Sequence, residues 1–247
     1  VQSSNNITFA RCTFEHLGAV YALGADTSSQ DIIVSNNTFT DISGGGVKLG
    51  KSGERGAPSP NVTLDPALQD RGYLVSDNLL TGIPAEYSGA NPVFAAYVAD
   101  TDIVHNTIHN SRYSGVCAGW GWGESSYVRN IRINNNSITM PMQRLADGGG
   151  VYTNTPCPRC HVSGNFFADD PAVYGCLYHD GGSSLWNDRD NVFSNITSHI
   201  VFAHGDSKHT TVTDIWYNDS EAPNLQGDTN RDVRDANGKC INTSIVK

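Results

Sequence analysis

Short runs of alternating apolar and polar residues recur along the chain, and each run ends at the same kind of turn. Ile33-Val34-Ser35-Asn36-Asn37 and Ile103-Val104-His105-Asn106 both end at an asparagine, and apolar residues resume within two positions. Such alternation predicts a short strand with one buried face. The asparagine predicts a bend, because it tolerates left-handed backbone angles and its amide can bond backbone groups.

The terminal asparagine returns at a nearly constant period. The positions that share this frame are Cys12, Asn37, Asn78, Asn106, Asn136, Asn165, Asn191 and Asn218. Successive positions are 25 to 30 residues apart, except for one interval of 41 residues. A fixed period of this size indicates stacked repeats, in which the asparagine amides would lie above one another as a ladder. We therefore predict an all-β, single-stranded right-handed parallel β-helix of the pectin-lyase-like type, with about eight coils. A β-sandwich is the alternative, but it has no reason to repeat its turn residue in one frame.

The repeat also predicts the domain organisation. We place the β-helix domain at residues 1–219 and a polar C-terminal tail at residues 220–247. The long interval indicates a loop insertion near residues 51–70, and solenoids often gather such insertions on a binding face. Because Val1 opens directly into a coil without a capping segment, we expect the sequence to be part of a longer chain.

Composition narrows the class of partner. The chain has 247 residues, a formal net charge of −9 and no basic stripe, so we expect no nucleic-acid partner. Its apolar runs are too short to cross a bilayer, so we expect no membrane partner. The acidity disfavours a polyanionic glycan and leaves a neutral oligosaccharide or polysaccharide as the expected partner. Seven Asn-X-Ser/Thr sequons suggest an extracellular, secreted glycoprotein, although the ladder frame itself creates several of them.

The six cysteines do not define a metal site. Cys117 and Cys176 follow their ladder asparagines at equal distances and would lie two coils apart, about 9–10 Å, which is too far for a disulfide. Cys157 and Cys160 are expected to close a small loop or to remain free thiols, because a zinc site needs a second ligand pair. We expect no metal and no cofactor.

Three successive coils carry unusual segments at matching places, namely Tyr113–Gly123, Asp147–Thr153 and Tyr174–Ser184. The strand alternation aligns Val116, Val151 and Leu177 as inward residues. It then places Cys117, Tyr152, Tyr178 and Asp180 outward on one side of the rod. The glycines in these segments would let a ligand approach the backbone closely.

Asp147 and Asp180 would then come from adjacent coils, as glycoside hydrolysis requires of its acid and its nucleophile or base. Aromatic surroundings would raise the pKa of one carboxyl by desolvation. Adjacent coils favour the carboxyl separation of about 5–5.5 Å typical of a retaining enzyme. The residues expected to line the sugar site are Tyr113, Trp120, Trp122, Tyr152, Tyr178 and His179. The alternative is that Asp147-Gly148 and Asp180-Gly181 only form turns. For residues 169–170 and 188–190 we expect solvated turns.

These segments resemble a known group. The run Tyr113–Gly123, the motif Asp147-Gly-Gly-Gly-Val-Tyr and the motif Tyr178-His-Asp-Gly-Gly-Ser-Ser are similar to right-handed β-helix glycoside hydrolases of family 141, which include α-L-fucosidase and xylanase activities. The resemblance implies that acidic residues in the last two motifs act in catalysis, which corresponds to Asp147 and Asp180 here. Relatives often carry a second acidic residue where this chain has Gly181.

Two other functions remain open from the sequence. A polysaccharide lyase or epimerase on the same scaffold would need a Lys or Arg base and usually calcium, and Lys48 and the outward Arg residues look scattered. A non-catalytic carbohydrate-binding β-helix module would have the same fold.

Overall fold

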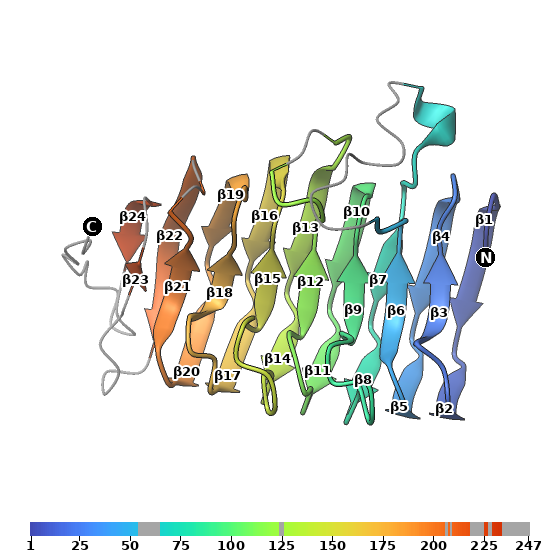
Figure 1. The fold of residues 1–247 in the computed structure, drawn as a ribbon, viewed down its shortest axis with the longest axis horizontal. Helices are drawn as coiled ribbons and strands as arrows, with labels where there is room; N and C mark the ends of the chain where they lie inside the picture. The colour runs from blue at the N-terminus through green and yellow to red at the C-terminus, as the bar shows by residue number, and fades with distance from the viewer. Residues whose placement is uncertain are drawn as a thin grey trace.

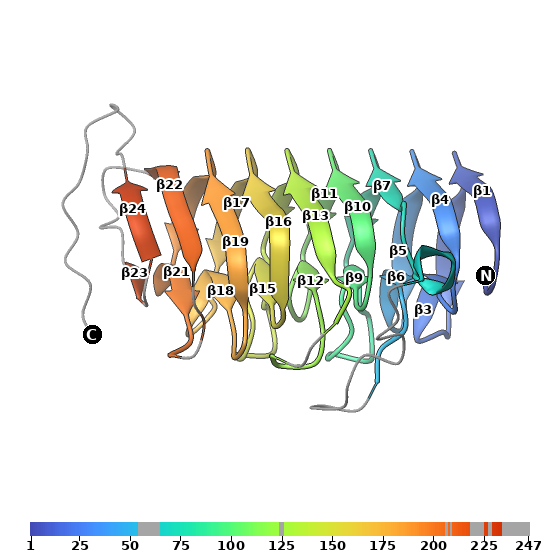
Figure 2. The same ribbon diagram turned by 90° about the horizontal axis from the view of Figure 1, so that it is seen from above.

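Short strands stack into one elongated solenoid in the computed structural model, which describes residues 1–53, 65–123, 126–205, 207, 209–217, 225–226 and 229–233. Each sequence repeat forms one coil, and the coils follow one another along the rod from β1 (Asn5–Ala10) at one end (Figure 1 and Figure 2). Every pairing between the named strands is parallel, as a solenoid wound in one direction requires.

The strands form three faces. The first sheet contains β1, β4 (Gln30–Ser35), β7 (Leu74–Ser76), β10 (Ala99–Val104), β13 (Arg129–Asn134), β16 (Pro156–Ser163), β19 (Ser184–Arg189), β22 (Thr210–Tyr217) and β24 (Thr229–Val233). The second contains β2 (Thr13–Leu17), β5 (Thr38–Ile42), β8 (Leu79–Thr81), β11 (Thr107–His109), β14 (Ser137–Thr139), β17 (Phe166–Asp170) and β20 (Val192–Ile196). The third contains β3 (Tyr21–Ala25), β6 (Gly45–Leu49), β9 (Val93–Ala95), β12 (Val116–Ala118), β15 (Val151–Thr153), β18 (Gly175–His179), β21 (His199–Ala203) and β23 (Leu225–Gln226).

The asparagine ladder is present between the first and second sheets. Asn106 is representative: its Oδ1 accepts hydrogen bonds from the backbone and the amide of Asn78, at 3.1 and 2.9 Å, and its Nδ2 donates to Asn136 Oδ1 at 3.0 Å. The same contacts join consecutive asparagines from Asn37 to Asn191. The backbone N–H of Cys12 donates to Asn37, which confirms its place in the frame. Asn218 lies outside the described residues.

The bend itself is made one position earlier than predicted. The residues with positive φ at this turn are those before the ladder position, namely Arg11, Asn36, Asp77, His105, Asn135, Gly164 and Asp190. The ladder asparagine is buried and uses its amide to bind its neighbours, so the left-handed conformation falls to the residue before it. Short polar residues and glycine dominate that position because they tolerate this backbone region.

Alternate residues of the strands on each face fill the core between the sheets. On the third sheet the inward row is Leu23, Val47, Val93, Val116, Val151, Leu177 and Val201, all of which are buried. On the second sheet, aromatic rings stack between neighbouring coils, as with Phe167 and Phe193 at a centroid distance of 5.1 Å. The equivalence of these positions explains why a simple alternation in the sequence predicts the register.

The solenoid extends beyond the predicted domain boundary. β23 pairs with β21 and β24 pairs with β22, both in parallel. The prediction of a polar tail from residue 220 is therefore wrong for residues 225–226 and 229–233, which continue the third and first sheets. The polar composition of the segment concealed these strands, because little of an apolar alternation is present there.

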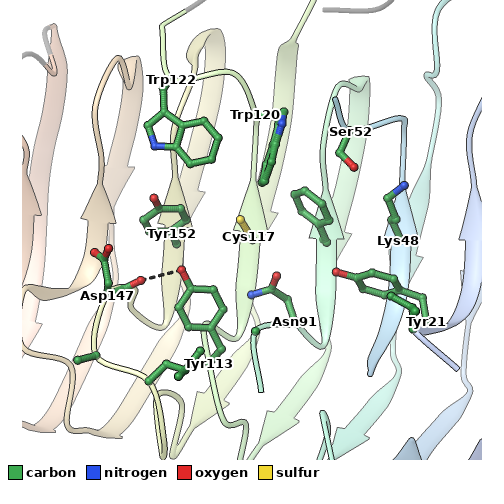
Figure 3. A pocket seen from close by; sticks show the side chains of 15 residues that line it. Tyr21, Lys48, Ser52, Asn91, Tyr113, Cys117, Trp120, Trp122, Asp147 and Tyr152 are labelled. Atoms are coloured by element: carbon green, nitrogen blue, oxygen red, sulfur yellow. Dashed lines mark hydrogen bonds between the residues drawn. The ribbon is translucent and has the colours of Figure 1, made fainter. Parts of the chain in front are cut away.

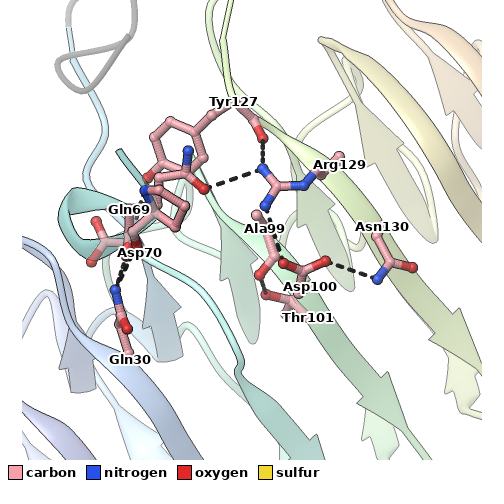
Figure 4. A network of polar contacts seen from close by, with 10 residues as sticks. Gln30, Gln69, Asp70, Ala99, Asp100, Thr101, Tyr127, Arg129 and Asn130 are labelled. Atoms are coloured by element: carbon pink, nitrogen blue, oxygen red, sulfur yellow. Dashed lines mark hydrogen bonds and ion pairs between the residues drawn. The ribbon is translucent and has the colours of Figure 1, made fainter. Parts of the chain in front are cut away.

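Part of the loop insertion near residues 51–70 lies outside the described residues, and its two ends contact different regions. Ser52 and Gly53 follow β6 above the third sheet. The returning end carries a short 3₁₀ helix, η1 (Pro66–Leu68), beside the first sheet. There Gln69 accepts a hydrogen bond from Arg129 at 3.2 Å, and Gln30 donates to the Gln69 carbonyl (Figure 4). These contacts fix the returning end to β4 and β13 of the first sheet.

Cys157 and Cys160 form a disulfide within β16, with a Cα–Cα distance of 5.5 Å. This confirms the pairing within the Cys-Pro-Arg-Cys segment as one of the two expected states. Cys12, Cys117 and Cys176 are free thiols. No helix in the described part of the chain is long and apolar enough to cross a membrane.

Two aspartates expected in solvated turns are buried instead. Asp170 and Asp188 both have an exposed fraction of 0 %. Asp170 accepts hydrogen bonds from the backbone N–H groups of Gly150, at 3.0 Å, and Ala172, at 2.8 Å, so it ties the approach to β15 to the end of β17. The prediction failed because neighbouring carboxylates are typical of an exposed turn. In each of these segments one aspartate is buried, while Asp169 and Asp190 are exposed.

We predict that Asp170 makes the stability of the protein depend on pH. Burial raises the pKa of Asp170 from 3.8 to about 6. The folded protein thus binds a proton more tightly than the unfolded chain, so this contribution favours the folded state below pH 4 and is lost as the pH rises to 6. The loss amounts to about 3 kcal/mol. Urea unfolding of wild type and Asp170→Asn across this range measures it. An unchanged pH profile in the variant contradicts the prediction.

Candidate functional site

The third sheet presents a continuous row of side chains to the outside of the rod. Across the strands β3, β6, β9, β12, β15, β18 and β21 the row consists of Gly24, Lys48, Phe94, Cys117, Tyr152, Tyr178 and Phe202. This confirms the predicted outward register of Cys117, Tyr152 and Tyr178. Phe94, Cys117, Tyr152 and Tyr178 are nearly buried and form an apolar cluster of their own, separate from the core. Because these side chains point outward and are still buried, other parts of the chain must cover them.

The cover comes from loops that flank the third sheet, and a pocket of about 980 Å³ lies between them. Trp120, Trp122 and Ser52 follow the strands and form one side of the pocket, as Figure 3 shows. Tyr113 and Asn91, which precede their strands, and Tyr21, the first residue of β3, form the opposite side. Lys48, Cys117 and Tyr152 lie between the two sides. Phe94 also lines the pocket and is in register with Lys48 and Cys117. The pocket thus spans successive coils over the third sheet.

The tryptophan side of the pocket is held in place by its own packing. Trp120 and Trp122 meet edge to face at a centroid distance of 4.7 Å, and Trp120 also meets the Phe94 ring at 5.4 Å. The Nε1–H of Trp120 donates to the Gly53 carbonyl at 2.9 Å. Gly119, Gly121 and Trp122 have positive φ, which gives the loop its tight turns. Both indoles remain half-buried and line the pocket.

Asp180 follows β18 and accepts hydrogen bonds from three aromatic side chains. The Nε1–H of Trp122 donates to Oδ2 at 3.2 Å, and the hydroxyl of Tyr178 donates to Oδ1 at 3.2 Å. The hydroxyl of Tyr152 makes a short contact with Oδ2. Two of these donors, Trp122 and Tyr152, also line the pocket. The carboxylate is therefore fixed in orientation at the edge of the pocket where β15 and β18 adjoin.

Asp147 lies on the side of the pocket formed by the loops that precede the strands. Its backbone carbonyl accepts a hydrogen bond of 2.6 Å from the Tyr113 hydroxyl, and its side chain is exposed (Figure 3). The charges of Asp147 and Asp180 both act on Tyr113 and on Tyr178. The two carboxyl groups therefore share one face of the rod, around the same tyrosines.

The tyrosines and the thiol of this site stay protonated. Burial, and then the neighbouring aspartate charges, raise the pKa of Tyr178 above its usual value of 10. The pKa of Tyr152 is raised by burial and by its hydrogen bond to Asp180. Burial and the Asp180 charge also raise the pKa of the Cys117 thiol. Each tyrosine hydroxyl donates its single proton within the site, so its oxygen can accept a hydrogen bond from a ligand. Cys117 is not a thiolate nucleophile.

His179 does not line the pocket. Its side chain points into the coil, with an exposed fraction of 1 %, where Nε2 lies 2.7 Å from Asp188 Oδ2 and Nδ1 lies 2.8 Å from Thr153 Oγ1. The alternation that turns Tyr178 outward turns His179 inward, because successive residues of a strand face opposite sides. His179 therefore anchors the strand before Asp180 from inside.

The sequence analysis missed several residues of the pocket. Phe94 and Lys48 occupy the same outward row as Cys117, and extending the alignment of inward valines to Val47 and Val93 would have found them. Lys48 is not isolated, since its Nζ lies 3.8 Å from Asp26. Tyr21 begins β3 and Asn91 precedes β9, and no local pattern marks either residue. Within the described residues, no group of three or more His, Cys, Asp or Glu side chains could hold a metal ion.

Fold and site together define a parallel β-helix protein with an aromatic pocket, bordered by two carboxyl groups, on one of its sheets. The family model for the right handed beta helix region matches residues 67–215. The chain therefore belongs to the right-handed β-helix family, and the predicted fold class is confirmed.

A solved structure of a protein named "Glycoside hydrolase" is similar to this chain, with 27% sequence identity and a TM-score of 0.69. The similarity covers 95% of this chain but only 37% of the other protein. No curated protein sequence matches the chain. The chain thus corresponds to little more than a third of its structural neighbour.

Proposed function

We propose that the pocket over the third sheet hydrolyses a glycosidic bond in a neutral glycan of the fucoside or xylan type. The observation that carries the proposal is Asp180, a carboxylate oriented by Trp122, Tyr152 and Tyr178 at the edge of an aromatic pocket. The similarity to a glycoside hydrolase structure supports the same class of reaction. The family 141 type of activity and the catalytic use of the two aspartates are part of this proposal.

The two carboxyl groups have different surroundings, and this suggests different roles. Asp180 is fixed by its donors and is the proposed nucleophile or general base. Asp147 is exposed, and its side chain has no hydrogen-bond partner among the described residues, so it is free to reach a glycosidic oxygen as the proposed acid. One carboxyl group must protonate the leaving oxygen while the other acts at the opposite face of the sugar ring.

The rest of the pocket suits an uncharged sugar chain. Its walls are mainly aromatic and aliphatic, with a few hydroxyl and amide groups, which is typical of sites that bind small organic ligands. The Tyr113 hydroxyl and the Asn91 amide can bond sugar hydroxyls. Lys48 is the cation in the pocket wall, and Asp26 offsets its charge. Catalysis by two carboxyl groups requires no cofactor.

The proposal is tested by incubating the purified protein with aryl-fucosides, aryl-xylosides and xylan, and by following the first product with NMR. We expect hydrolysis of at least one of these substrates. Retention at the anomeric carbon would identify Asp180 as the nucleophile, and inversion would identify it as the general base. An unsaturated product would establish the lyase alternative, and binding without turnover would establish a carbohydrate-binding module.

A further inference from the structure

A second cleft adjoins the pocket on the side of Tyr21. It has a volume of about 570 Å³ and is lined by Val20, Tyr21, Tyr87, Ser88, Gly89 and Ala90. Val20, Tyr21 and Gly89 also line the first pocket. Because the two spaces share part of their walls, a ligand that occupies the pocket can continue into the cleft.

The cleft displays apolar side chains that nothing in the described structure covers. The Tyr87 side chain is 49% exposed and Val20 is 64% exposed. The Tyr87 ring has no aromatic partner among the described residues, in contrast to the rings of the pocket, which pack against one another. Exposed apolar side chains that gather beside a pocket indicate a surface for a ligand.

The segment that carries Tyr87 is firmly attached to the rod. The backbone N–H of Ala85 donates to the Ile42 carbonyl at 2.8 Å, and that of Tyr87 donates to the Ser43 carbonyl at 2.7 Å. The Ser43 hydroxyl donates to Glu86 Oε2 at 2.8 Å. A ring on a backbone fixed in this way loses little conformational freedom when a ligand stacks on it.

Glycine 89 leaves the passage between the two spaces open. A Cβ atom added at Gly89 would meet no other atom within 4 Å. None of the residues that line the cleft carries a formal charge. An aromatic face, a serine hydroxyl and no charged side chain suit the apolar face and the hydroxyl groups of a neutral sugar ring.

We propose that this cleft is a second sugar subsite, in which the Tyr87 ring stacks on a neutral sugar unit of the same glycan whose bond the pocket cleaves. The inference rests on the proposed function in one respect, namely that the ligand is a glycan. It makes the substrate an oligosaccharide or polysaccharide chain, in which the unit at Tyr87 contributes to binding and not to the chemical step.

The test is a titration of wild type, Tyr87→Ala and Phe166→Ala with neutral xylo-oligosaccharides of increasing length, followed by calorimetry. Phe166, which is 41% exposed on the second sheet and lines neither space, serves as the control. Each variant is first compared with wild type by circular dichroism and thermal unfolding. We expect wild-type affinity to increase with chain length and Tyr87→Ala to weaken binding of the long oligosaccharides about tenfold. Binding of the shortest ones should be unchanged.

A second variant, Ser88→Phe, places a bulky ring in the cleft at a residue that does not line the first pocket. It should abolish the gain in affinity with length and leave binding of short ligands intact. Equal weakening at all lengths in Tyr87→Ala, or no weakening at all, overturns the subsite, as does a folded wild type that binds none of these glycans. Length-dependent binding without turnover leaves the subsite standing and refutes the hydrolase proposal. Turnover that changes neither with oligosaccharide length nor with the Tyr87→Ala substitution supports the hydrolase proposal and refutes the subsite.

Discussion

Replacement of Asp180 by asparagine is expected to lower kcat on an aryl glycoside by about a thousandfold while the protein stays folded. Asparagine has nearly the same shape and still offers one oxygen to the Trp122 and Tyr152 donors. It lacks the negative charge that attack on the sugar, or removal of a proton from water, requires. The loss should therefore appear in kcat, with ligand binding largely kept. Steady-state kinetics and calorimetric binding measure the two effects separately.

The matched control for this variant is Asp190→Asn. Asp190 is exposed and precedes the ladder position with a positive φ of 55°, a conformation that asparagine adopts easily. It should have wild-type activity. Asp147→Asn should also lower kcat, more for poor leaving groups than for good ones, because a general acid matters most when the leaving oxygen is basic. An Asp180→Asn variant that retains activity within threefold of wild type would refute the catalytic assignment.

Replacement of Asn106 by alanine is expected to lower the free energy of unfolding by about 3–5 kcal/mol. Asn106 is 1% exposed, and its amide joins three successive coils. Alanine would remove the acceptor of the Asn78 backbone and amide N–H groups and the donor to the Val75 carbonyl. These groups would remain buried without partners, which costs more than the loss of an exposed hydrogen bond.

Urea unfolding followed by circular dichroism measures this effect, with Asn187→Ala as the control. Asn187 is half-buried on the outer face of β19, so its loss should cost less than about 0.5 kcal/mol. Because each coil contacts only its neighbours, a break in the ladder near the middle of the rod weakens both halves. Similar stabilities for Asn106→Ala and Asn187→Ala would show that the ladder contributes little.

The fold was predictable because the repeat encodes it locally. Every coil needs a buried amide at one turn and an inward apolar residue on each strand. The solenoid and its register were therefore predictable from the asparagines between Asn37 and Asn191 and from the inward row of Val116, Val151 and Leu177. The same alternation predicted the outward positions of Tyr152 and Tyr178. It also implied an inward position for His179, but we expected a site residue there because histidine is common in active sites.

The boundary of the solenoid was not predictable in the same way. β23 and β24 pair in parallel with β21 and β22, and the sequence of that segment carries little of the apolar alternation. Burial of Asp170 was hidden for a related reason. Its partners are the N–H groups of Gly150 and Ala172, and backbone donors leave no mark in a sequence.

The sequence by itself thus determined the stacked coils, their register and the face on which the aromatic and acidic residues of three adjacent coils gather, because these depend on the periodicity of single strands. Only the tertiary structure decided which loops enclose that face. Tyr21 begins a strand, and Asn91 and Ser52 lie in separate loops. They meet Trp120 and Asp147 only when the coils stack. The cleft beside Tyr87 has the same origin, since the lengths and paths of loops are set by contacts between coils and not by the repeat.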